Sequence, residues 1–599
     1  MRTWRRSTGW AAATLVAAAV LSAGVGRRGA RAGDRDREAL PTARVDSVRN
    51  FTLPDLDGKP RSLVDHRKAK AIVLAWTAPG CPVAMVYAPR LAELAKTYAA
   101  QEVAFLGVAS DAGESLDDLR RLVKDGGTPY PVLLDADGTL AQALSIKTTT
   151  TAVVLDANWR VRYRGAVDDQ YGVNGRKPAA DHAWLKDALD AVLAARPVAK
   201  EATDAPGCPI TFKSTARPGA TTTSTWSGDV AKIVHARCAT CHRENGGAPF
   251  GLGTYAELSA RTAVVREVID QNRMPPWHAV GEEGRFSNDR RLKAAEKTTL
   301  LEWLDAGAPE GDASKAPAPP PALALDAWEM GKPDQIFTFD KPQSIPAEGV
   351  VPYRFVTIPT KLTEDKWVKA VEVQPGAPGV VHHVLVGFDP PSHRGRGAVF
   401  APWGGFFAAM VPGGRLQVFP DGMAKKLPAG TTLLFQMHYT PNGVATTDTT
   451  RIGLRYADKE PEREVKTAGV MAIDLRIPPG EANYKVRGQL PVPFNARILA
   501  FMPHMHVRGT SFRYSIQKIV GGGEETTLLE VPRYDFNWQT PYRLTTPIAV
   551  PRGYWLRGVA TYDNSANNPY NPDPTAWVTW GDQTWDEMMI GYVDYVLDP

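Results

Sequence analysis

Cysteine and histidine are scarce in this chain, and neither sign of charge dominates. Only four cysteines and eleven histidines occur among 599 residues, and the formal net charge is +5. The sequence contains no basic stripe and no interleaving of basic with aromatic residues. We therefore expect no nucleic acid partner. The length allows three to four domains of about 100–200 residues each.

Long hydrophobic runs are also missing, except at the N-terminus. An apolar, alanine-rich run from Trp10 to Val25 follows three arginines. This run is too short for a comfortable bilayer crossing, and it predicts a secretory signal peptide over residues 1–32. We expect a periplasmic or secreted protein with no stable membrane span after cleavage. An uncleaved signal would leave the protein anchored to the membrane.

Histidine is rare but clustered in the last third of the chain. Five of the eleven histidines fall in three short motifs, and a methionine-bearing segment follows near the C-terminus. The residues of this series are His382, His383, His438, His504, His506 and Met588. Imidazole suits copper, and a thioether adds preference for Cu(I). The series predicts two metal sites with three protein ligands each, which leaves a position open for oxygen or substrate.

The geometry of a β-strand limits how these motifs can bind metal. In His504-Met505-His506, both rings lie on one face of a strand because side chains alternate. The adjacent His382 and His383 would point to opposite faces of a regular strand. They can bind one metal ion only if the strand ends or bulges there.

The region from about Trp328 to Pro599 resembles the copper type II, ascorbate-dependent monooxygenases. The resemblance is carried by Val381-His382-His383-Val384, Gln436-Met437-His438-Tyr439, His504-Met505-His506 and Asp586-Glu587-Met588. It implies two β-sandwich (jelly-roll) subdomains, at residues 328–463 and 464–599. The first three histidines would hold an electron-transfer copper. His504, His506 and Met588 would hold the oxygen-activating copper, with Tyr592 as a neighbouring aromatic.

Two departures from that family bear on the substrate. This region contains no cysteine, whereas the animal enzymes are rich in disulfides. Peptide-hydroxylating members place an arginine two residues before the His-x-His pair, where this chain has Met502. Without that bidentate carboxylate clamp, a glycine-extended peptide is not the expected substrate.

A second motif, Cys238-Ala239-Thr240-Cys241-His242, is a C-x-x-C-H sequence. This pattern predicts covalent haem c, with His242 as the proximal ligand. A zinc half-site would need further cysteine or histidine ligands nearby. Met274, in a proline-bounded loop, is the predicted distal ligand, and His278 is the alternative. Residues 228–311 resemble small monohaem cytochrome c domains.

Strands and helices alternate over residues 45–200, which predicts an α/β layer fold. Expected strands lie at 71–76, 103–108 and 153–156, and expected helices at 89–99 and 115–124. This part resembles the redoxin branch of the thioredoxin fold.

Cys81 stands ahead of the first of these helices, where its thiolate would be stabilised. The second cysteine of a reducing pair is missing, and Thr150-Thr151 occupies the place of the usual cis-proline. Only Cys208 could resolve Cys81, because the other two cysteines belong to the haem motif. The alternative is a structural module with a Cys81–Cys208 bond in an oxidising compartment.

Together these motifs predict an exported copper monooxygenase that hydroxylates a C–H bond of a small organic substrate with dioxygen. The cofactors would be two copper ions and haem c, and the fused haem would relay electrons. Ascorbate or a periplasmic protein donor would be the reductant. Two alternatives stay open: a copper and haem redox or copper-handling protein that does not hydroxylate, and a thiol peroxidase-like redox protein.

Overall fold

The structure is a computed structural model that describes residues 46–112, 114–172, 175–212, 216–324, 327–390 and 405–598. The predicted signal peptide at 1–32 lies outside the described residues. Among the described residues, no helix has both the length and the apolar character that a membrane crossing requires.

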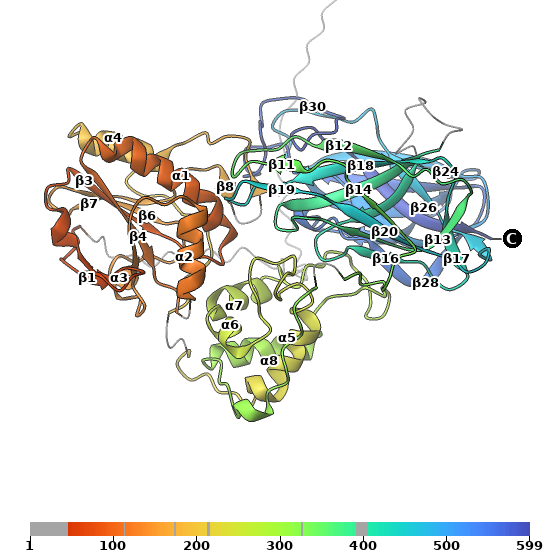
Figure 1. Cartoon of the computed structure of the whole chain (residues 1–599). Helices are drawn as coiled ribbons and strands as arrows, with labels where there is room; N and C mark the ends of the chain where they lie inside the picture. Colours follow the sequence, from red (N-terminus) through yellow and green to blue (C-terminus); the bar gives the residue numbers. More distant parts are fainter. Residues whose placement is uncertain are drawn as a thin grey trace, which may run out of the picture. The chain divides into compact units, whose positions relative to one another are not determined.

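The N-terminal part is an α/β layer built on a five-stranded sheet (Figure 1, red to orange). The strand order is β5-β4-β3-β6-β7; β3 pairs parallel with β4 and antiparallel with β6. The elements are β3 (Ala71–Trp76), β4 (Val103–Ala109), β5 (Val132–Leu134), β6 (Ala152–Asp156), β7 (Val161–Gly165), α1 (Pro82–Ala99), α2 (Leu116–Asp125), α3 (Thr139–Ala143) and α4 (Trp184–Leu193). Apolar clusters cover both faces of the sheet. The predicted α/β layer and its strands are confirmed.

Helix α1 is longer than expected. The prediction started it at Pro89, but it begins at Pro82, with Cys81 as the N-cap residue and Pro89 inside the helix. Pro82 is compatible with a start because the first helical residue needs no intrahelical N–H bond. Pro89 removes the bond to the carbonyl of Met85. The buried apolar side chains along this helix stabilise it despite that loss.

A helical segment follows in the chain. It comprises α5 (Ala231–Arg237), α6 (Tyr255–Ser259), α7 (Thr262–Asp270) and α8 (Ala294–Asp305). Its core holds Trp226, Trp303 and Leu304. Helices α6 and α7 are separate, because Arg261 between them departs from helical backbone angles. Thr254 and Glu257 form a capping box that fixes the start of α6.

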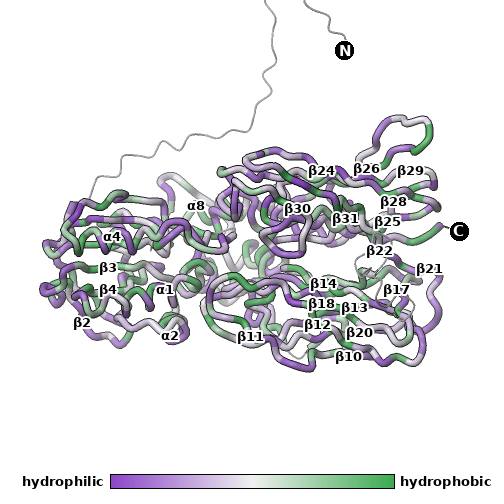
Figure 2. The backbone as a smooth tube through the Cα atoms, turned by 90° about the horizontal axis from the view of Figure 1, so that it is seen from above, coloured by the Kyte–Doolittle hydropathy of each residue, from purple (hydrophilic) through white to green (hydrophobic). Residues whose placement is uncertain are grey.

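The last part of the chain is β-rich, and its larger sheets pack in two pairs (Figure 2). In the first pair, one sheet holds β10 (Gln335–Thr338), β20 (Arg451–Tyr456), β13 (Lys366–Gln374), β17 (Met423–Leu427), β21 (Arg463–Glu464) and β16 (Leu416–Val418). The other holds β12 (Arg354–Pro359), β18 (Thr432–Tyr439), β14 (Val381–Asp389) and β15 (Phe406–Met410). One apolar cluster joins residues of both sheets, among them Val371 and Phe435.

The second pair repeats this arrangement. One sheet holds β22 (Lys466–Met471), β31 (Ile590–Leu597), β25 (Ala496–His504) and β28 (Tyr542–Val550). The other holds β24 (Tyr484–Val492), β29 (Tyr554–Tyr562), β26 (Gly509–Lys518) and β27 (Thr526–Val531). Their shared core includes Phe512 and Val593. Exposed and buried residues alternate along most of β24, as expected where one face of a sheet meets a core.

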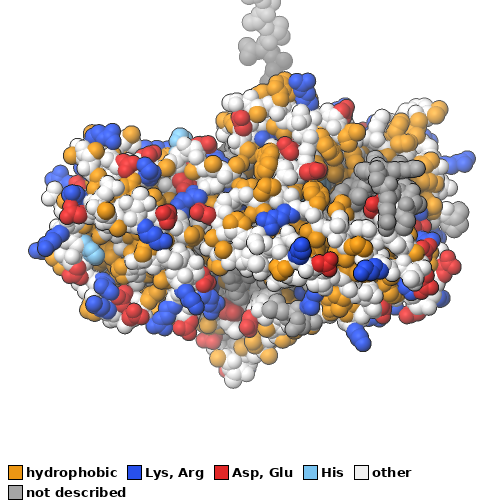
Figure 3. All heavy atoms as spheres, turned by 45° about the horizontal axis from the view of Figure 1, so that its top comes forward, with side chains coloured by type: hydrophobic (Ala, Val, Ile, Leu, Met, Phe, Trp, Pro, Cys, Tyr) orange, Lys and Arg blue, Asp and Glu red, His pale blue; other side chains and the backbone are white. Residues whose placement is uncertain are grey.

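Surface charge is mixed in sign. On the face shown in Figure 3, Lys and Arg side chains are interspersed with Asp and Glu, and none of the charges gathers into a stripe.

Candidate functional site

The adjacent histidines lie near the start of β14, where the strand is irregular. The pairing of β14 with β18 shifts register between Val381 and His383, and His383 lies opposite His438 on β18. This irregularity lets His382 and His383 turn to the same side, which a regular strand would not allow. The ring centroids of His382 and His383 are 5.2 Å apart, and those of His383 and His438 are 4.8 Å apart.

The three rings of this first set converge through their Nδ1 atoms. Nδ1 of His382 lies 3.0 Å from Nδ1 of His383 and 3.1 Å from Nδ1 of His438. A neutral imidazole carries a single N–H group. Nδ1 of His382 therefore cannot donate a hydrogen bond to both neighbouring Nδ1 atoms. The ligand atoms of these three residues all lie within 4.8 Å of one another, which is compact enough to hold a metal ion.

The second set lies at the end of β25 in the other sheet pair. His504 and His506 have ring centroids 5.4 Å apart. Nδ1 of His504 donates to Oε1 of Gln539 at 2.7 Å, and Nδ1 of His506 donates to the Asp586 carbonyl at 3.1 Å. With the proton held on Nδ1, Nε2 of each ring is free to bind a metal. Metal-binding histidines typically have such an outer partner.

Unpaired buried nitrogens test whether these residues suit a metal. Nε2 of His504 and of His506, the ring nitrogen left free by the Nδ1 hydrogen bonds, is buried and has no hydrogen-bond partner among the described residues. Burial lowers the pKa of all five imidazoles, to about 4 for His382 and His504 and to about 3 for His506. At neutral pH the rings are therefore uncharged, the form that binds metal. A buried nitrogen without a hydrogen-bond partner destabilises the folded protein unless something binds it. These histidines therefore fit a metal centre.

Met588 and Tyr592 lie on the same side of the second sheet pair. Both belong to a small buried apolar cluster with Met502, Phe406 and Leu385. The carboxylate of Glu587, next to Met588, accepts hydrogen bonds from the backbone N–H of His506 and of Arg508, each at 2.8 Å. The backbone before Met588 is therefore tied directly to the His506 segment. That the Met588 sulfur is a ligand remains a prediction.

Three residues at this site were not predicted from sequence: Gln539, Tyr353 and Phe536. Gln539 bonds His504, and the rings of Tyr353 and Phe536 contact histidines of both sets. None belongs to a metal-ligand residue type at ligand spacing. The only signal for these residues in the sequence was the position of Gln539, a polar residue directly after Phe536-Asn537-Trp538.

The C-x-x-C-H motif begins at the end of α5, where Cys238 is the C-cap residue. Nδ1 of His242 donates to the Phe250 carbonyl at 3.1 Å, and the two rings have centroids 4.9 Å apart. Nε2 of His242 is thus the nitrogen available to a haem iron. One open cavity is lined by Cys238, Cys241, His242, Val265 and Met274.

The structure also bears on the choice between Met274 and His278. The N–H of Met274 donates to the Val268 carbonyl at the end of α7. Trp277, beside His278, packs against Phe286 and Tyr542 in the core of the second sheet pair. The charged groups that affect the pKa of His278 are Asp535 and Arg533, which lie outside the helical segment. Both Met274 and His278 line the cavity that the C-x-x-C-H residues line, and the choice of Met274 over His278 as distal ligand stays a prediction.

Cys81, at the N-cap of α1, is buried. Its sulfur accepts hydrogen bonds from the Thr149 hydroxyl at 3.0 Å and from the Cys208 thiol. Despite burial, which acts in the opposite direction, these bonds lower the pKa of Cys81 to about 6. Cys208 donates to Cys81, and its own pKa is raised well above the usual value. The structure therefore brings the two predicted thiols together as a thiolate and a thiol.

Cys208 reaches this position because residues 201–211 pack on the α/β layer. Backbone bonds join Glu201 and Thr203 to Arg164, Cys208 to Thr149, and Ile210 to Lys147. Gly207 passes so close to the Thr149 carbonyl that a Cβ atom there would clash with it. We call residues 201–211 the strap.

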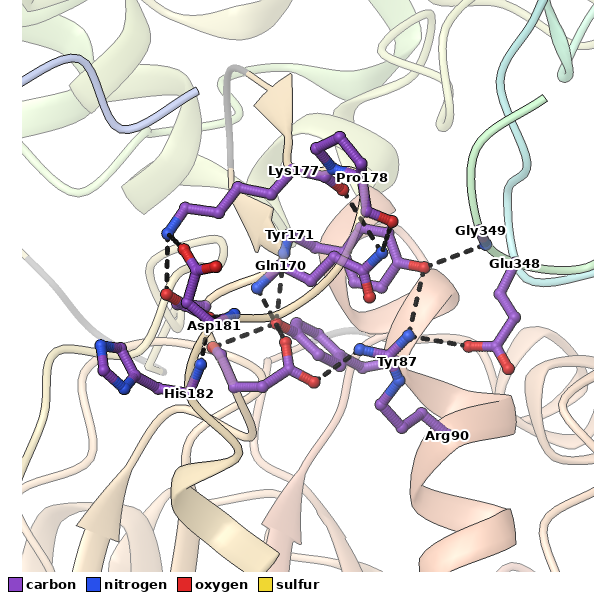
Figure 4. A network of polar contacts seen from close by, with 12 residues as sticks. Tyr87, Arg90, Gln170, Tyr171, Lys177, Pro178, Asp181, His182, Glu348 and Gly349 are labelled. Carbon is purple, nitrogen blue, oxygen red and sulfur yellow. Dashed lines mark hydrogen bonds and ion pairs between the residues drawn. The ribbon is translucent and has the colours of Figure 1, made fainter. Parts of the chain in front are cut away.

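Figure 4 shows a polar network between α1 and the segment that follows β7. Asp168 accepts from the Tyr87 hydroxyl at 2.6 Å and pairs with Arg90, also at 2.6 Å. Lys177 pairs with Asp169 at 2.7 Å and with Asp181 at 2.8 Å. These bonds fix α1, and with it Cys81 at its start, to the segment that follows β7.

Comparisons with known proteins concern the N-terminal part of the chain. Residues 45–168 match the family model described as AhpC/TSA family. A hypothetical protein from Sinorhizobium meliloti is 28% identical over 28% of this chain and 95% of that one, with a TM-score of 0.27. A thiol:disulfide interchange protein of the thioredoxin family from Chlorobium tepidum is 27% identical over 20% and 86%, with a TM-score of 0.19.

A peroxidoxin from Mycobacterium tuberculosis is 23% identical over 25% of this chain and 92% of that one, with a TM-score of 0.20. A comparison with curated proteins found no match. The N-terminal part is therefore a redoxin domain with a thioredoxin-like α/β fold. This domain supports a redox function of the oxidoreductase type.

Proposed function

We propose that this chain is an exported copper-dependent monooxygenase that hydroxylates a C–H bond of a small organic substrate with dioxygen. The observation that carries the proposal is the convergence of three neutral imidazoles, His382, His383 and His438, through Nδ1, together with the buried and unpaired Nε2 atoms of His504 and His506. Imidazole is a good copper ligand, and a thioether adds preference for Cu(I). The residues that would hold the two ions are His382, His383 and His438 for one, and His504, His506 and Met588 for the other.

Copper at these positions would supply one-electron redox chemistry and an open coordination position for dioxygen. The chain's own residues prepare the site for it. Gln539 and the Asp586 carbonyl hold the protons of His504 and His506 on Nδ1. Met502 and Tyr592 form part of a buried apolar wall beside Met588. Such a wall limits the access of water to the site.

The reaction consumes two electrons and two protons with each molecule of dioxygen, and it yields the hydroxylated substrate and water. We propose that Cys238, Cys241 and His242 would hold haem c, which would supply one-electron transfer toward the first histidine set. Ascorbate or a periplasmic protein would reduce the haem or the copper from outside. The hydrogen bond from His242 to the Phe250 carbonyl supports this role, because it leaves Nε2 of His242 as the nitrogen that would bind the haem iron.

Copper-loaded protein is expected to consume dioxygen when ascorbate is supplied, and the consumption should rise when a hydroxylatable small molecule is added. Oxygen-electrode traces with a panel of small aromatic and aliphatic compounds, followed by mass spectrometry of the products, measure this. Apo protein treated with a chelator is the control. Copper-loaded protein that neither consumes dioxygen nor forms a hydroxylated product from any compound would contradict the proposal.

A second candidate function rests on the Cys81–Cys208 pair. A thiolate next to a protonated thiol suits reduction of a hydroperoxide. The Cys81 thiolate would attack the O–O bond, release an alcohol or water, and become a sulfenic acid. Cys208 would then attack that sulfur, release water, and leave a disulfide. The AhpC/TSA match over residues 45–168 supports this activity.

Hydrogen peroxide is expected to convert Cys81 and Cys208 to a disulfide in wild-type protein, because the two thiols already share a hydrogen bond. In the Cys208→Ser variant, the sulfenic acid of Cys81 should persist and react with dimedone. Peptide mass spectrometry distinguishes these products, with Cys81→Ser as the matched control. Dimedone labelling equal in wild type and Cys208→Ser would exclude Cys208 as the resolving thiol.

The rate of this oxidation should depend on pH in a defined direction. The lowered pKa of Cys81 means that its thiolate predominates above about pH 6. As pH falls below that value, the thiolate fraction and the rate should decrease about tenfold per pH unit. Stopped-flow measurements of the oxidation rate between about pH 4.5 and about pH 8 test this pH dependence. A rate that rises only near the ordinary pKa of cysteine would contradict the thiolate assignment.

A further inference from the structure

The strap follows α4, the last helix of the redoxin domain, and brings Cys208 back to Cys81. We propose that the strap occupies an edge of the domain where an extended segment of another protein would otherwise dock. It would thereby restrict Cys81 to hydroperoxides and other small oxidants and exclude the disulfides of other proteins. This proposal rests on the thiol chemistry proposed for Cys81 and Cys208, and it adds the class of substrate that the site accepts.

The first half of the strap extends the sheet at β7, which is an edge strand. The N–H of Arg164 in β7 donates to the Glu201 carbonyl at 3.0 Å, and the N–H of Thr203 donates to the Arg164 carbonyl at 3.2 Å. The Thr203 hydroxyl accepts from the N–H of Ala166 at 2.8 Å and lies 2.7 Å from the hydroxyl oxygen of Tyr163. The strap thus takes the place of a further strand at this edge.

The second half of the strap pairs with the loop directly before β6. In that loop, the hydroxyl of Thr149 donates to the Cys81 sulfur at 3.0 Å. The N–H of Thr149 donates to the Cys208 carbonyl at 3.0 Å, and the N–H of Ile210 donates to the Lys147 carbonyl at 2.9 Å. An extended peptide docks on a sheet edge through main-chain hydrogen bonds of this kind. The strap therefore occupies the backbone groups that such a peptide would need beside Cys81.

The fit between strap and loop is closest at Gly207. A Cβ atom on this glycine would overlap the Thr149 carbonyl oxygen and would lie 2.8 Å from the Thr149 hydroxyl oxygen. The φ angle of Gly207 is +156°, a conformation that residues with a side chain rarely adopt. A larger residue at this position would therefore push the strap away from the loop.

The far end of the strap is anchored in the core of the redoxin domain. Ile210 is buried, and together with Phe212 it joins one of the two apolar clusters that cover the sheet. Between them, the N–H of Thr211 donates to the Asp111 carboxylate, and its carbonyl accepts from the N–H of Ala112 at 2.8 Å. The strap is thus fixed on both sides of Cys208.

The two thiols differ in how they can be reached. Cys81 is only 1% exposed, whereas Cys208 is half-buried and lines the open cavity that Pro82 and Met85 also line. A molecule that enters from this cavity meets the strap before it reaches Cys81. Hydrogen peroxide is little larger than water, so small local motions admit it. A disulfide on a folded protein would require the strap to open, which is a local unfolding event.

Labelling of the reduced full-length protein with two maleimides of different size tests the proposal. N-ethylmaleimide and fluorescein maleimide share one reactive group, and peptide mass spectrometry measures modification of Cys81 by each. Each rate is divided by the rate of the same reagent with glutathione. Wild-type Cys81 should react with the large reagent at least about tenfold more slowly than with the small one, because the large one needs the strap to open. Equal normalised rates would overturn the proposal.

Two strap variants should remove most of this difference in rate. Gly207→Val introduces the clash with the loop and so favours the open strap. Thr203→Val is milder, because it keeps the size of the side chain and removes only its contacts with Ala166 and Tyr163. If Gly207→Val fails to fold by circular dichroism, Thr203→Val decides the outcome.

The matched control is Gly247→Val, since a Cβ atom at Gly247 would meet no atom within 4 Å. This variant should keep the wild-type ratio of the two rates. Folded strap variants that also keep the wild-type ratio would show that the strap does not control access to Cys81.

Insulin, a protein with accessible disulfides, tests the substrate class directly. Attack of the Cys81 thiolate on an insulin disulfide forms a mixed disulfide and releases the other insulin sulfur as a thiolate. In Cys208→Ser no resolving thiol breaks this bond, so the product is visible by non-reducing electrophoresis. Combining Gly207→Val with Cys208→Ser should raise its yield at least about tenfold over Cys208→Ser alone, because the strap is displaced.

Equal insulin adducts in the single and double variants would contradict the exclusion of protein disulfides. A different result bears on the thiol peroxidase candidate. If hydrogen peroxide fails to oxidise Cys81 while the size selectivity toward maleimides is intact, the peroxidase function is overturned and the role of the strap stands.

Discussion

The His506→Ala variant is expected to bind about one copper ion per chain instead of about two, and to lose reductant-driven oxygen consumption. His506 is fully buried, and its Nε2 has no partner among the described residues. Its other nitrogen is held by the Asp586 carbonyl. Alanine removes the ligand and leaves no neighbouring imidazole able to replace it, because His504 is already part of the same set. Copper analysis and oxygen-electrode traces measure both effects.

A control separates loss of a ligand from general damage. His182 is exposed and stacks on Trp184 in the redoxin domain, far along the chain from every proposed ligand. His182→Ala should keep the full copper content and full oxygen consumption. If His506→Ala retains two copper ions and undiminished oxygen consumption, the second set is not the oxygen-side site.

The second large effect concerns the haem motif. Cys238→Ala combined with Cys241→Ala should abolish covalent haem, because both thioether bonds are lost. The single Cys241→Ala variant should retain haem through one bond and show a weaker covalent band. Haem staining of denatured protein, after expression with a haem-maturation system, measures retention.

Cys81→Ser serves as the control for the haem variants, since Cys81 lies in the redoxin domain at the start of α1. It should leave haem and copper loading unchanged. Wild-type protein without a haem band that survives denaturation would contradict the haem assignment. Loss of copper in Cys81→Ser would show instead that the redoxin thiols take part in metal loading.

The sequence predicted those features that depend on residue type and local pattern. The alternation of strands and helices predicted the α/β layer, and the position of Cys81 ahead of a helix matches its N-cap role. The adjacent pair His382-His383 required an irregular strand to bind one ion, and the structure has a register shift there.

Features that depend on long-range packing could not be read from the sequence. Gln539 lies 156 residues from His383, and only the packing of the two sheet pairs brings them together. The composition of the strap does not reveal its backbone bonds to Arg164 and Thr149. The start of α1 was misplaced because Pro89 usually marks the beginning of a helix rather than its interior.

Copper content of the full-length protein, measured by atomic spectroscopy after loading and extensive dialysis, tests the central claim most directly. The account predicts about two copper ions per chain in wild type, and a near-complete loss when His383 and His506 are both replaced by alanine, since neutral imidazoles are the principal ligands. A wild-type chain that retains no copper, or a double variant that retains as much as wild type, would contradict it.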